Sequence, residues 1–402
     1  MKIVLVHNRY QQGGGEDVVF AQERWNLERA GHDVVAYHRS NWEIDDPATL
    51  GERLALAKNT VWSVRTRRDF AEVLARETPD IVHVHNTFVV ISPSIYGACQ
   101  EHGVPVVQTL HNFRLICPAA TFYRDGNTCE ECLGRSLWSA VHHGCYRGSR
   151  TATATVALML ATHRLLGTWC DSIDSYIALT AFSRDKFIAA GFNPDKIFVK
   201  PNFIDPDPGP RAVVGDYAVF TGRLSPEKGV MTLLRAWERL PVRCPLQIVG
   251  DGPERPRLEA FARERNIRGV IFRGRLTHEE TVATVKGARF AIVPSVYYEG
   301  FPMVIAEAMA CGVPIVCSRL GAMEEIVADG VTGLHFSAGD PDDLTRKVEW
   351  AWRHSSEMRQ MGRAARCEYE TRYTADRNYS RLMDIYERTL HRQIDSIPAV
   401  SS

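Results

Sequence analysis

The sequence predicts an α/β protein built from two doubly wound, Rossmann-like domains that face each other across a cleft. Apolar strand-like runs alternate with amphipathic segments in both halves of the chain, which favours parallel sheets with right-handed crossovers. The proline-rich segment 202–210 separates the two halves and is the best candidate for a domain boundary. The length of 402 residues is enough for two or three domains, each with its own core.

Short apolar runs in the first half are typical of buried parallel strands. The strands expected there are 2–7, 33–37, 81–85, 105–109 and 175–180. The helices expected between them are 16–30, 94–102 and 182–190. We therefore expect residues 1–203 to form an N-terminal Rossmann-like domain with a cysteine-containing insertion at about 113–150.

After the proline-rich segment the alternation starts again. The expected strands are 217–221, 246–249, 270–272, 290–294 and 313–318. The expected helices are 230–238, 254–265, 278–286, 302–311, 341–354 and 355–370. Residues 211–372 are thus predicted to form a C-terminal Rossmann-like domain. The last helical pattern, at about 375–392, is predicted to return to the first domain, because it has no strand of its own to cover.

The composition is that of a soluble globular protein. Lys plus Arg equals Asp plus Glu, 48 against 48, so the overall charge does not indicate a nucleic-acid partner. The N-terminal apolar run is too short for a signal peptide, and no segment reaches the roughly 20 apolar residues that span a bilayer. We expect a cytoplasmic protein whose ten cysteines are mostly reduced.

The segment from Ser295 to Pro314 carries the strongest chemical pattern. A loop, Glu299-Gly300-Phe301, joins an apolar strand to a helix that begins near Pro302 and ends before Gly312. Glu299 and Glu307 therefore bracket the N-terminus of a helix at the carboxyl end of a strand. Open α/β sheets bind ligands at that edge, and a helix N-terminus favours an anion.

A glycine cluster, Gly13-Gly14-Gly15, lies between the first expected strand and helix. Glycines at a helix start let backbone N–H groups approach a phosphate, although a plain tight turn explains the cluster equally well. The spacing G-x-G-x-x-G is absent, because the next glycine is Gly31, and this disfavours a dinucleotide-dependent hydride-transfer enzyme.

Two further loops follow strands of the second half. Phe220-Thr-Gly-Arg-Leu-Ser-Pro-Glu-Lys-Gly229 carries Arg223 and Lys228, which suit a diphosphate but could equally be a solvated surface pair. Val249-Gly-Asp-Gly-Pro-Glu254 is a second strand-to-helix loop of phosphate- or base-contact type.

These motifs together resemble the family 4 retaining glycosyltransferases. The resemblance rests on Thr221-Gly-Arg-Leu-Ser-Pro-Glu-Lys-Gly229, on Val249-Gly-Asp-Gly-Pro253 and above all on the Glu-x7-Glu block from Tyr298 to Pro314. The first half agrees through its glycine loop and through Leu110-His-Asn112 at a strand end. The resemblance covers most of residues 1–370 and implies the two-domain fold called GT-B, with a UDP- or GDP-sugar as donor.

The resemblance also implies roles for single residues. Glu307 would hold the ribose hydroxyls, and Glu299 the sugar hydroxyls, together with the backbone of Gly300, Phe301, Pro302 and Met303. Arg223, Lys228 and the adjacent Gly222 would meet the diphosphate, which Gly13, Gly14 and Gly15 would approach from the other domain. His111 would contact the sugar near the reacting carbon, and Asp251, Arg275 and Leu276 lie at the expected base-contact loops.

The implied reaction is sugar transfer to a glycan or polyprenyl-linked acceptor in the synthesis of bacterial surface polysaccharide or glycoconjugate. In this family, retention of configuration is attributed to attack on the front face, with the leaving phosphate taking the acceptor proton. Two cations and a helix N-terminus suit the developing phosphate charge, so no catalytic metal is expected. The acidic pairs Asp45-Asp46, Asp205-Pro-Asp207 and Asp340-Pro-Asp-Asp343 look like turn or cap sequences rather than a magnesium site.

Three other functions remain open. A glycosidase would use Glu299 and Glu307 as its pair of carboxyls, but their placement beside a phosphate-type helix start argues against this. A sugar-nucleotide epimerase of the same fold is the enzymatic alternative. A non-catalytic sugar-nucleotide-binding subunit is the other, and it would have no need of cations at a leaving-group site.

Four cysteines of the insertion, Cys117, Cys129, Cys132 and Cys145, form the pattern C-x11-C-x2-C-x12-C. Four thiols with one close pair match a structural zinc site in ligand type and number, although a redox pair or unliganded thiols stay open. The span 132–170 has no Asp or Glu and holds four arginines and two tryptophans beside the apolar run 156–161. This pattern suits contact with an anionic inner-leaflet membrane surface, but a buried helix with a few solvated arginines explains it at least as well.

Overall fold

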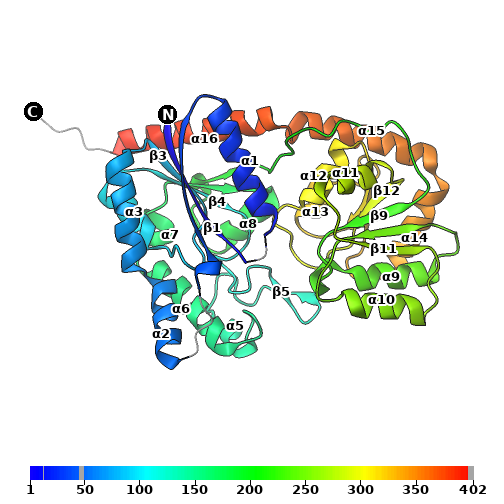
Figure 1. Ribbon diagram of the computed structural model, residues 1–402, viewed down its shortest axis with the longest axis horizontal. Coiled ribbons are helices and arrows are strands. Elements are labelled where there is room, and N and C mark those ends of the chain that lie inside the picture. The colour runs from blue at the N-terminus through cyan, green and yellow to red at the C-terminus, as the bar shows by residue number, and fades with distance from the viewer. Residues whose placement is uncertain (12, 45–48, 397–402) are drawn as a thin grey trace, which may run out of the picture. The chain divides into compact units, whose positions relative to one another are not determined.

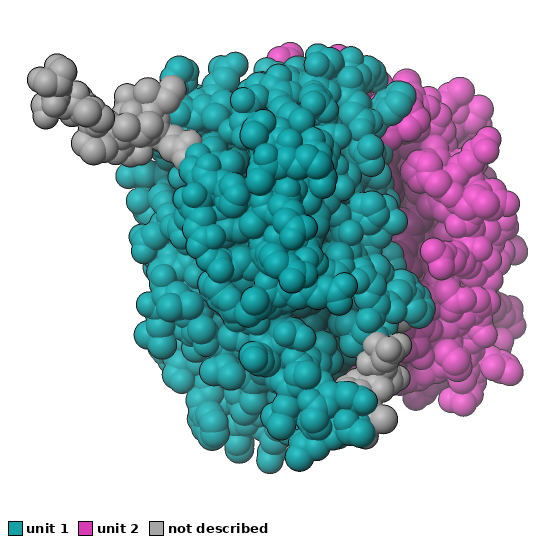
Figure 2. All heavy atoms as spheres, turned by 60° about the vertical axis from the view of Figure 1, so that its left-hand side comes forward, with its two compact units in different colours: residues 1–121, 130–201, 378–402 teal, residues 122–129, 202–377 magenta. Residues whose placement is uncertain are grey.

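The computed structural model describes residues 1–11, 13–44 and 49–396, without the side chains of 393–396. The chain forms two compact units, coloured teal and magenta in Figure 2. Unit 1 contains residues 1–121, 130–201 and those from 378 onward, and unit 2 contains residues 122–129 and 202–377. The expected turn at Asp45-Asp46 lies outside the described residues.

Unit 1 is built on a six-stranded parallel sheet in the order β2-β1-β3-β4-β7-β8 (Figure 1). Its strands are β1 (Lys2–Arg9), β2 (Asp33–Ser40), β3 (Ile81–Asn86), β4 (Val106–Leu110), β7 (Ser175–Ala178) and β8 (Ile197–Val199). Every residue of β3, β4 and β7 is buried, as expected for strands covered on both faces. The strand order turns between β1 and β3, and this turning point is where such sheets bind ligands.

In the described part of unit 1, eight α-helices precede the last strand. They are α1 (Gly15–Arg29), α2 (Leu50–Val61), α3 (Val64–Glu77), α4 (Ser94–Glu101), α5 (Trp138–His143), α6 (Arg150–Leu165), α7 (Thr168–Asp171) and α8 (Ala181–Ala189). Figure 1 shows α2, α5 and α6 beside one another at one end of the unit, and α6 packs against both of the others.

Unit 2 has its own six-stranded parallel sheet, in the order β11-β10-β9-β12-β13-β14. The strands are β9 (Ala218–Thr221), β10 (Leu246–Val249), β11 (Val270–Gly274), β12 (Phe290–Val293), β13 (Ile315–Ser318) and β14 (Gly333–Phe336). The helices are α9 (Val230–Arg239), α10 (Arg255–Glu264), α11 (His278–Lys286), α12 (Met303–Ala310), α13 (Ala322–Ile326), α14 (Pro341–Arg353) and α15 (Ser355–Arg372). This order places the switch point between β9 and β12.

The last helix, α16 (Ala375–Ser396), belongs to unit 1 from Asn378 onward. Leu382, Ile385 and Tyr386 of this helix join the buried cluster that contains Ile3 and Leu5 of β1. The helix therefore completes the core of unit 1, because its apolar side chains cover residues of that sheet.

The two-domain α/β architecture predicted from the sequence is confirmed. The sequence-based elements omit the helices α2, α3, α5, α7 and α13, the hairpin strands β5 and β6, and the edge strands β8 and β14. Residues 122–129 form a small hairpin, β5 (Tyr123–Arg124) with β6 (Asn127–Thr128), that belongs to unit 2 and not to the first domain as expected. No helix in the described part of the chain is long and apolar enough to cross a membrane.

Candidate functional site

The carboxyl ends of β9, β10 and β12 are held together by loops in very close contact. A Cβ atom on Gly250 would lie 1.8 Å from the carbonyl oxygen of Gly222, and one on Gly229 would lie 1.9 Å from that of Pro294. Both glycines also have a positive φ, 134° and 69°. Side chains are excluded at these positions, so the loops converge at the switch point of unit 2.

Lys228 and Glu299 form an ion pair between the loop after β9 and the loop after β12. The Nζ atom of Lys228 lies 2.7 Å from Oε1 of Glu299, and Ser295 donates a hydrogen bond of 2.7 Å to the same oxygen. The hydroxyl of Tyr297 donates to Oε2 at 2.7 Å, and the lysine ammonium lies over the Tyr297 ring. The carboxylate that the sequence assigned to sugar hydroxyls thus directly contacts the cation assigned to phosphate.

This pairing fixes the charge of Glu299. Burial alone would raise the pKa of its carboxyl, but the positive charge of Lys228 and the hydrogen bonds from Lys228, Tyr297 and Ser295 lower the pKa below its ordinary value. Glu299 is therefore a carboxylate at neutral pH, and it holds Lys228 in place.

The helix α12 begins at Met303, with Pro302 at its N-cap position in an extended conformation. The sequence predicted that the helix begins at Pro302, which is one residue earlier than its start in the structure. Phe301 is buried and packs on the ring of Tyr373, which orients the preceding loop. Gly312 has a φ of 67° just after the helix, as predicted for a left-handed cap.

Glu307 lies one turn into α12 and is only partly buried. Burial raises the pKa of its carboxyl above the ordinary value, although His278 opposes the shift. No described residue donates a hydrogen bond to its side chain or forms an ion pair with it. The oxygens of Glu307 are consequently available to a ligand hydroxyl.

The remaining predicted donor-site residues follow neighbouring strands of the same sheet. Arg223, after Gly222 at the end of β9, is exposed and has no ion-pair partner among the described residues. Asp251, after β10, accepts from the backbone N–H of Gly252 and pairs with Arg255 at 3.1 Å, so it stabilises its own loop. Arg275 is exposed and Leu276 half-buried in the loop after β11.

The glycine loop of unit 1 opens helix α1 beside two acidic side chains. Gly14 is the N-cap residue, and its N–H donates to Oδ2 of Asp17 at 2.8 Å. The other side chain is Glu16, whose carboxyl accepts from Asn86 Nδ2 at 3.0 Å. Burial, with the charge of Asp17, raises the pKa of Glu16 to about 8. A neutral Glu16 removes one negative charge from a loop predicted to meet a diphosphate.

His111 follows β4 and contacts residues that the sequence did not indicate. Its Nε2 atom lies 2.9 Å from Nδ1 of His85, and the two rings are stacked with centroids 5.1 Å apart. Behind His85 lie Glu23 of α1 and Lys200, which follows β8. The sequence signal for His85 was the run His83-Val-His85, since alternate residues of a buried strand point to the same face.

The four predicted zinc ligands are divided between the two units. Cys129 belongs to unit 2, whereas Cys117, Cys132 and Cys145 belong to unit 1. Among the described residues, Glu23, His83 and His85 are the group whose potential ligand atoms all lie within 4.8 Å of one another, and no cysteine belongs to it. The cysteine zinc site stays a prediction.

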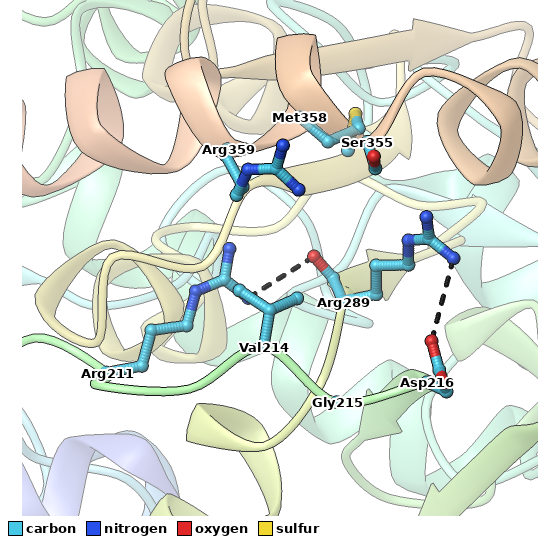
Figure 3. A pocket seen from close by; sticks show the side chains of 8 residues that line it. All are labelled: Arg211, Val214, Gly215, Asp216, Arg289, Ser355, Met358 and Arg359. Carbon is cyan, nitrogen blue, oxygen red and sulfur yellow. Dashed lines mark hydrogen bonds and ion pairs between the residues drawn. The ribbon is translucent and has the colours of Figure 1, made fainter.

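Unit 2 also has a cavity of about 130 Å³ that the sequence did not indicate (Figure 3). Arg211, Arg289 and Arg359 line it together with Asp216 and Ser355. The first two arginines are already engaged, Arg211 with the carbonyl oxygens of Ala288 and Arg289, and Arg289 with Asp216 at 3.8 Å. Asp216 precedes β9 and Arg289 precedes β12, so the cavity lies at the amino ends of these parallel strands, away from the loops that hold Lys228 and Glu299.

Two family models together match nearly the whole chain. The model for Glycosyltransferase Family 4 matches residues 13–208, and the model for Glycosyl transferases group 1 matches residues 211–367. The two matches meet at the proline-rich segment and correspond to the two sheets.

Curated relatives include an uncharacterized glycosyltransferase of Methanocaldococcus jannaschii, 35% identical over 33% of this chain and 38% of its own length. Glycogen synthase of Mycobacterium tuberculosis is 30% identical over 72% of this chain and 64% of its own length. The matched region thus spans less than two thirds of either relative. The O-antigen chain mannosyltransferase B of Escherichia coli is 31% identical over 42% of this chain and 46% of its own length.

Solved structures with the same fold can be superposed on this chain over almost the full length of both proteins. HepE of Anabaena, solved with UDP, has a TM-score of 0.71 at 16% identity and covers 96% of this chain and 100% of its own. Sucrose-phosphate synthase of Thermosynechococcus elongatus has a TM-score of 0.70 at 18% identity and covers 97% and 99%. With its two parallel sheets and matching family models, the chain belongs to the family 4 type of GT-B glycosyltransferases.

Proposed function

We propose that the protein is a retaining glycosyltransferase that moves a sugar from a nucleotide-diphospho-sugar to a glycan or lipid-linked acceptor. The observation that carries this proposal is the Lys228–Glu299 pair at the switch point of unit 2, beside the N-terminus of α12. The solved complexes of the similar protein HepE with UDP and with UDP-glucose support a nucleotide-sugar donor.

The geometry supports a separate task for each group. Glu307, which has no partner among the described side chains, accepts hydrogen bonds from the ribose hydroxyls. Lys228 and Arg223 meet the diphosphate, and the N-terminal end of α12 adds its partial positive charge. Glu299 holds Lys228 through Oε1 and accepts sugar hydroxyls.

The chemical step breaks the bond between the anomeric carbon and the phosphate oxygen. The acceptor hydroxyl oxygen forms a new bond to that carbon on the same face, and its proton passes to the departing phosphate oxygen. Negative charge develops on that oxygen, and preorganised cations stabilise it. Lys228 and Arg223 can provide this stabilisation without a catalytic metal.

We further propose that unit 1 docks on an anionic membrane surface, where a polyprenyl-linked acceptor would be presented. Large apolar side chains are exposed on α2 and α6, including Leu54, Leu158 and Leu165, which is 88% exposed. Trp138 at the start of α5 is 72% exposed, and Arg150 begins α6 nearby. Exposed apolar groups beside arginines are the combination that interfacial binding uses.

A liposome assay tests the docking surface. Wild type should co-sediment with vesicles that contain anionic lipid at low salt, and Leu158→Glu/Leu165→Glu should not. The control Val331→Glu alters an exposed apolar residue of unit 2 and should bind like wild type. Equal sedimentation of all three proteins, or no sedimentation of wild type, contradicts this part of the proposal.

A thermal-shift screen against UDP- and GDP-sugars tests the donor. A ligand present at 100 times its dissociation constant adds about 2.7 kcal/mol to the free energy of unfolding. A stabilising donor is then incubated with and without candidate acceptors. Donor conversion to an epimer without any acceptor indicates the epimerase alternative, and binding without turnover under any condition indicates a non-catalytic subunit.

A further inference from the structure

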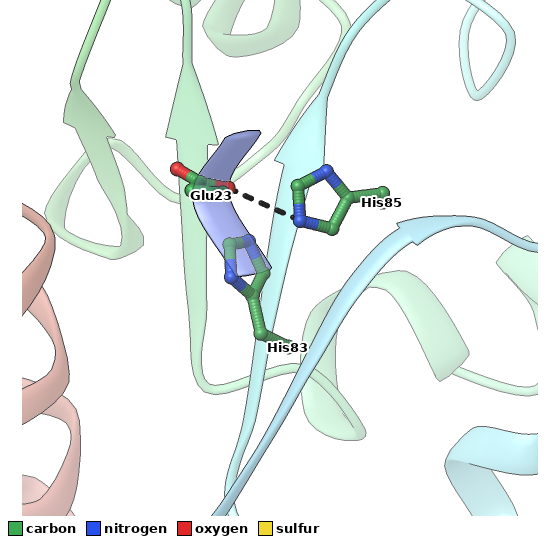
Figure 4. Close-up of side chains that lie close together, drawn as sticks. All are labelled: Glu23, His83 and His85. Atoms are coloured by element: carbon green, nitrogen blue, oxygen red, sulfur yellow. Dashed lines mark ion pairs between the residues drawn. The ribbon is translucent and has the colours of Figure 1, made fainter. Parts of the chain in front are cut away.

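A chain of buried polar groups leads from Lys200 to His111 within unit 1. Lys200 is 1% exposed, and its ammonium contacts Oε1 of Glu23 and lies 3.2 Å from Oδ1 of Asn378. The second carboxylate oxygen of Glu23 lies 3.1 Å from Nε2 of His85. Nδ1 of His85 in turn lies 2.9 Å from Nε2 of His111. Figure 4 shows the ion pair between the carboxylate of Glu23 and the ring of His85.

A bound metal ion explains this cluster poorly. Glu23, His83 and His85 could together offer three ligand atoms. However, Nδ1 of His83 lies 2.8 Å from the Tyr386 hydroxyl and its Nε2 lies 2.8 Å from the Thr109 hydroxyl, so both ring nitrogens have partners. The ammonium of Lys200 already neutralises Glu23 and would repel a divalent cation beside it.

The contacts fix where the protons are. Nε2 of His85 and Oε2 of Glu23 face each other at the ion-pair distance of 3.1 Å, and neither atom has a hydrogen-bond partner in the described part of the chain. A carboxylate only accepts hydrogen bonds, so Nε2 of His85 carries the proton. Burial lowers the pKa of His85, so its ring is neutral and Nδ1 is an acceptor. Nε2 of His111 must then be the donor to that atom.

The tautomer of His85 also determines that of His111, which is one of the predicted site residues. Burial lowers the pKa of His111 well below its ordinary value, so this ring is also neutral. Its proton is on Nε2, which leaves a lone pair on Nδ1. No described residue forms a hydrogen bond with Nδ1 of His111. This atom also differs from the fully buried side-chain atoms that lack a hydrogen-bond partner, because it is not one of them.

We propose that Glu23 and His85 are positioning residues that hold His111 as the Nε2–H tautomer, so that its Nδ1 accepts a hydrogen bond from a sugar hydroxyl. Lys200 keeps Glu23 charged and so sustains the arrangement. The proposal rests on the proposed function, because it assigns the sugar as the ligand of His111. It also makes His111 an acceptor for hydroxyl groups rather than a donor to the phosphate.

The test is histidine-selective ¹⁵N NMR together with steady-state kinetics. Wild-type His85 and His111 should both give the neutral Nε2–H signature. In Glu23→Gln/Lys200→Met the charges are removed together, and the new amide can either accept from or donate to Nε2 of His85, so neither tautomer is fixed any longer. We expect His111 to lose its single Nε2–H form and kcat/KM to fall about 10- to 100-fold, the range known for outer-shell partners of metal-ligating histidines.

His83→Phe is the matched control, because His83 lies on the same buried strand but its hydrogen bonds go to Tyr386 and Thr109. It should lower the unfolding temperature and leave the His111 tautomer unchanged. His85→Asn retains the Lys200–Glu23 pair and gives a second test if the double variant does not fold. In that variant His111 should lose its single tautomer.

Several results would overturn this proposal. These are a wild-type His111 that is Nδ1–H or doubly protonated, a double variant with an unchanged His111 tautomer and unchanged kcat/KM, or a stoichiometric divalent metal that is lost with Glu23. The NMR measurement needs no turnover. A wild type that transfers no sugar but shows the expected tautomers would therefore refute the proposed function and leave the tautomer assignment standing.

Discussion

Lys228 and Glu299 are joined by an ion pair of 2.7 Å across the switch point between β9 and β12. The two residues come from loops 71 positions apart in the sequence. Their pairing means that the group assigned to the leaving phosphate and the group assigned to the sugar are mechanically coupled. A change to either one should alter the position of the other.

Removing the ammonium should affect turnover strongly. We expect Lys228→Ala to lower kcat about 100- to 1,000-fold, because loss of one preorganised donor to a developing oxyanion has that effect. The measurement is the initial rate of nucleotide release with saturating donor. Arg319→Ala, which removes a cation from the half-exposed pair with Asp329, should keep the wild-type rate. A Lys228→Ala rate equal to wild type would remove this residue from the mechanism.

The same pair predicts how stability depends on pH. The pKa of Glu299 is lowered in the folded state, so the pair stabilises the fold above the ordinary glutamate pKa, and this contribution disappears as pH falls through the lowered value. In Lys228→Met, burial without a counter-charge should instead raise that pKa, so the variant loses stability as pH rises above about 4.5.

The deficit of Lys228→Met relative to wild type should therefore be small near pH 4 and larger at pH 7. Loss of one partner of a buried ion pair should lower the free energy of unfolding by about 3 kcal/mol at neutral pH. Thermal unfolding of both proteins across this range measures the difference. A deficit that does not change with pH would show that Glu299 does not titrate with Lys228 as described.

Glu307 should contribute to donor binding with little effect on folding. Its carboxyl has no partner among the described side chains, so Glu307→Gln should leave the unfolding temperature unchanged or raise it slightly. Loss of charge-assisted hydrogen bonds to ribose should cost about 1.5–3 kcal/mol of binding free energy. The exposed Glu279 of α11 provides the control Glu279→Gln. Unimpaired donor affinity in Glu307→Gln would contradict the ribose role.

The contact between the loops after β9 and β10 can be tested with one methyl group. Gly250→Ala places a Cβ against the carbonyl oxygen of Gly222, and we expect loss of at least 3 kcal/mol of stability or failure to fold. Gly330→Ala is matched in having a positive φ, 75°, but has open space around it. It should cost about 1–2 kcal/mol. Similar unfolding temperatures for both variants would indicate that the loops are not so tightly packed.

Local patterns were sufficient for most of the architecture. The buried strands of both sheets are continuous apolar runs, and Gly312 ended its helix as expected. Helix α3 was missed because five of its first six residues are charged or polar. Its only capping signal is Ser63, which precedes the helix. The edge strand β8 has only three residues, too few for a periodic pattern.

The buried contacts that lead from Lys200 through Glu23 and His85 to His111 could not be predicted from the sequence. Lys200 and Glu23 are 177 positions apart, and each taken alone resembles an ordinary surface charge. Only the fold of unit 1 brings them together, because α1 and the end of β8 meet over the same sheet. Residues 122–129 illustrate the same limit, since they lie in the first half of the sequence and yet belong to unit 2.

The most direct measurement of the central claim is titration calorimetry of the stabilising nucleotide sugar against wild type, Lys228→Ala, Glu307→Gln and Glu279→Gln. We predict that wild type and Glu279→Gln bind alike and that the other two variants bind at least about tenfold more weakly, the equivalent of about 1.4 kcal/mol. A wild type that binds no nucleotide sugar, or Lys228 and Glu307 variants that bind as tightly as wild type, would contradict the account.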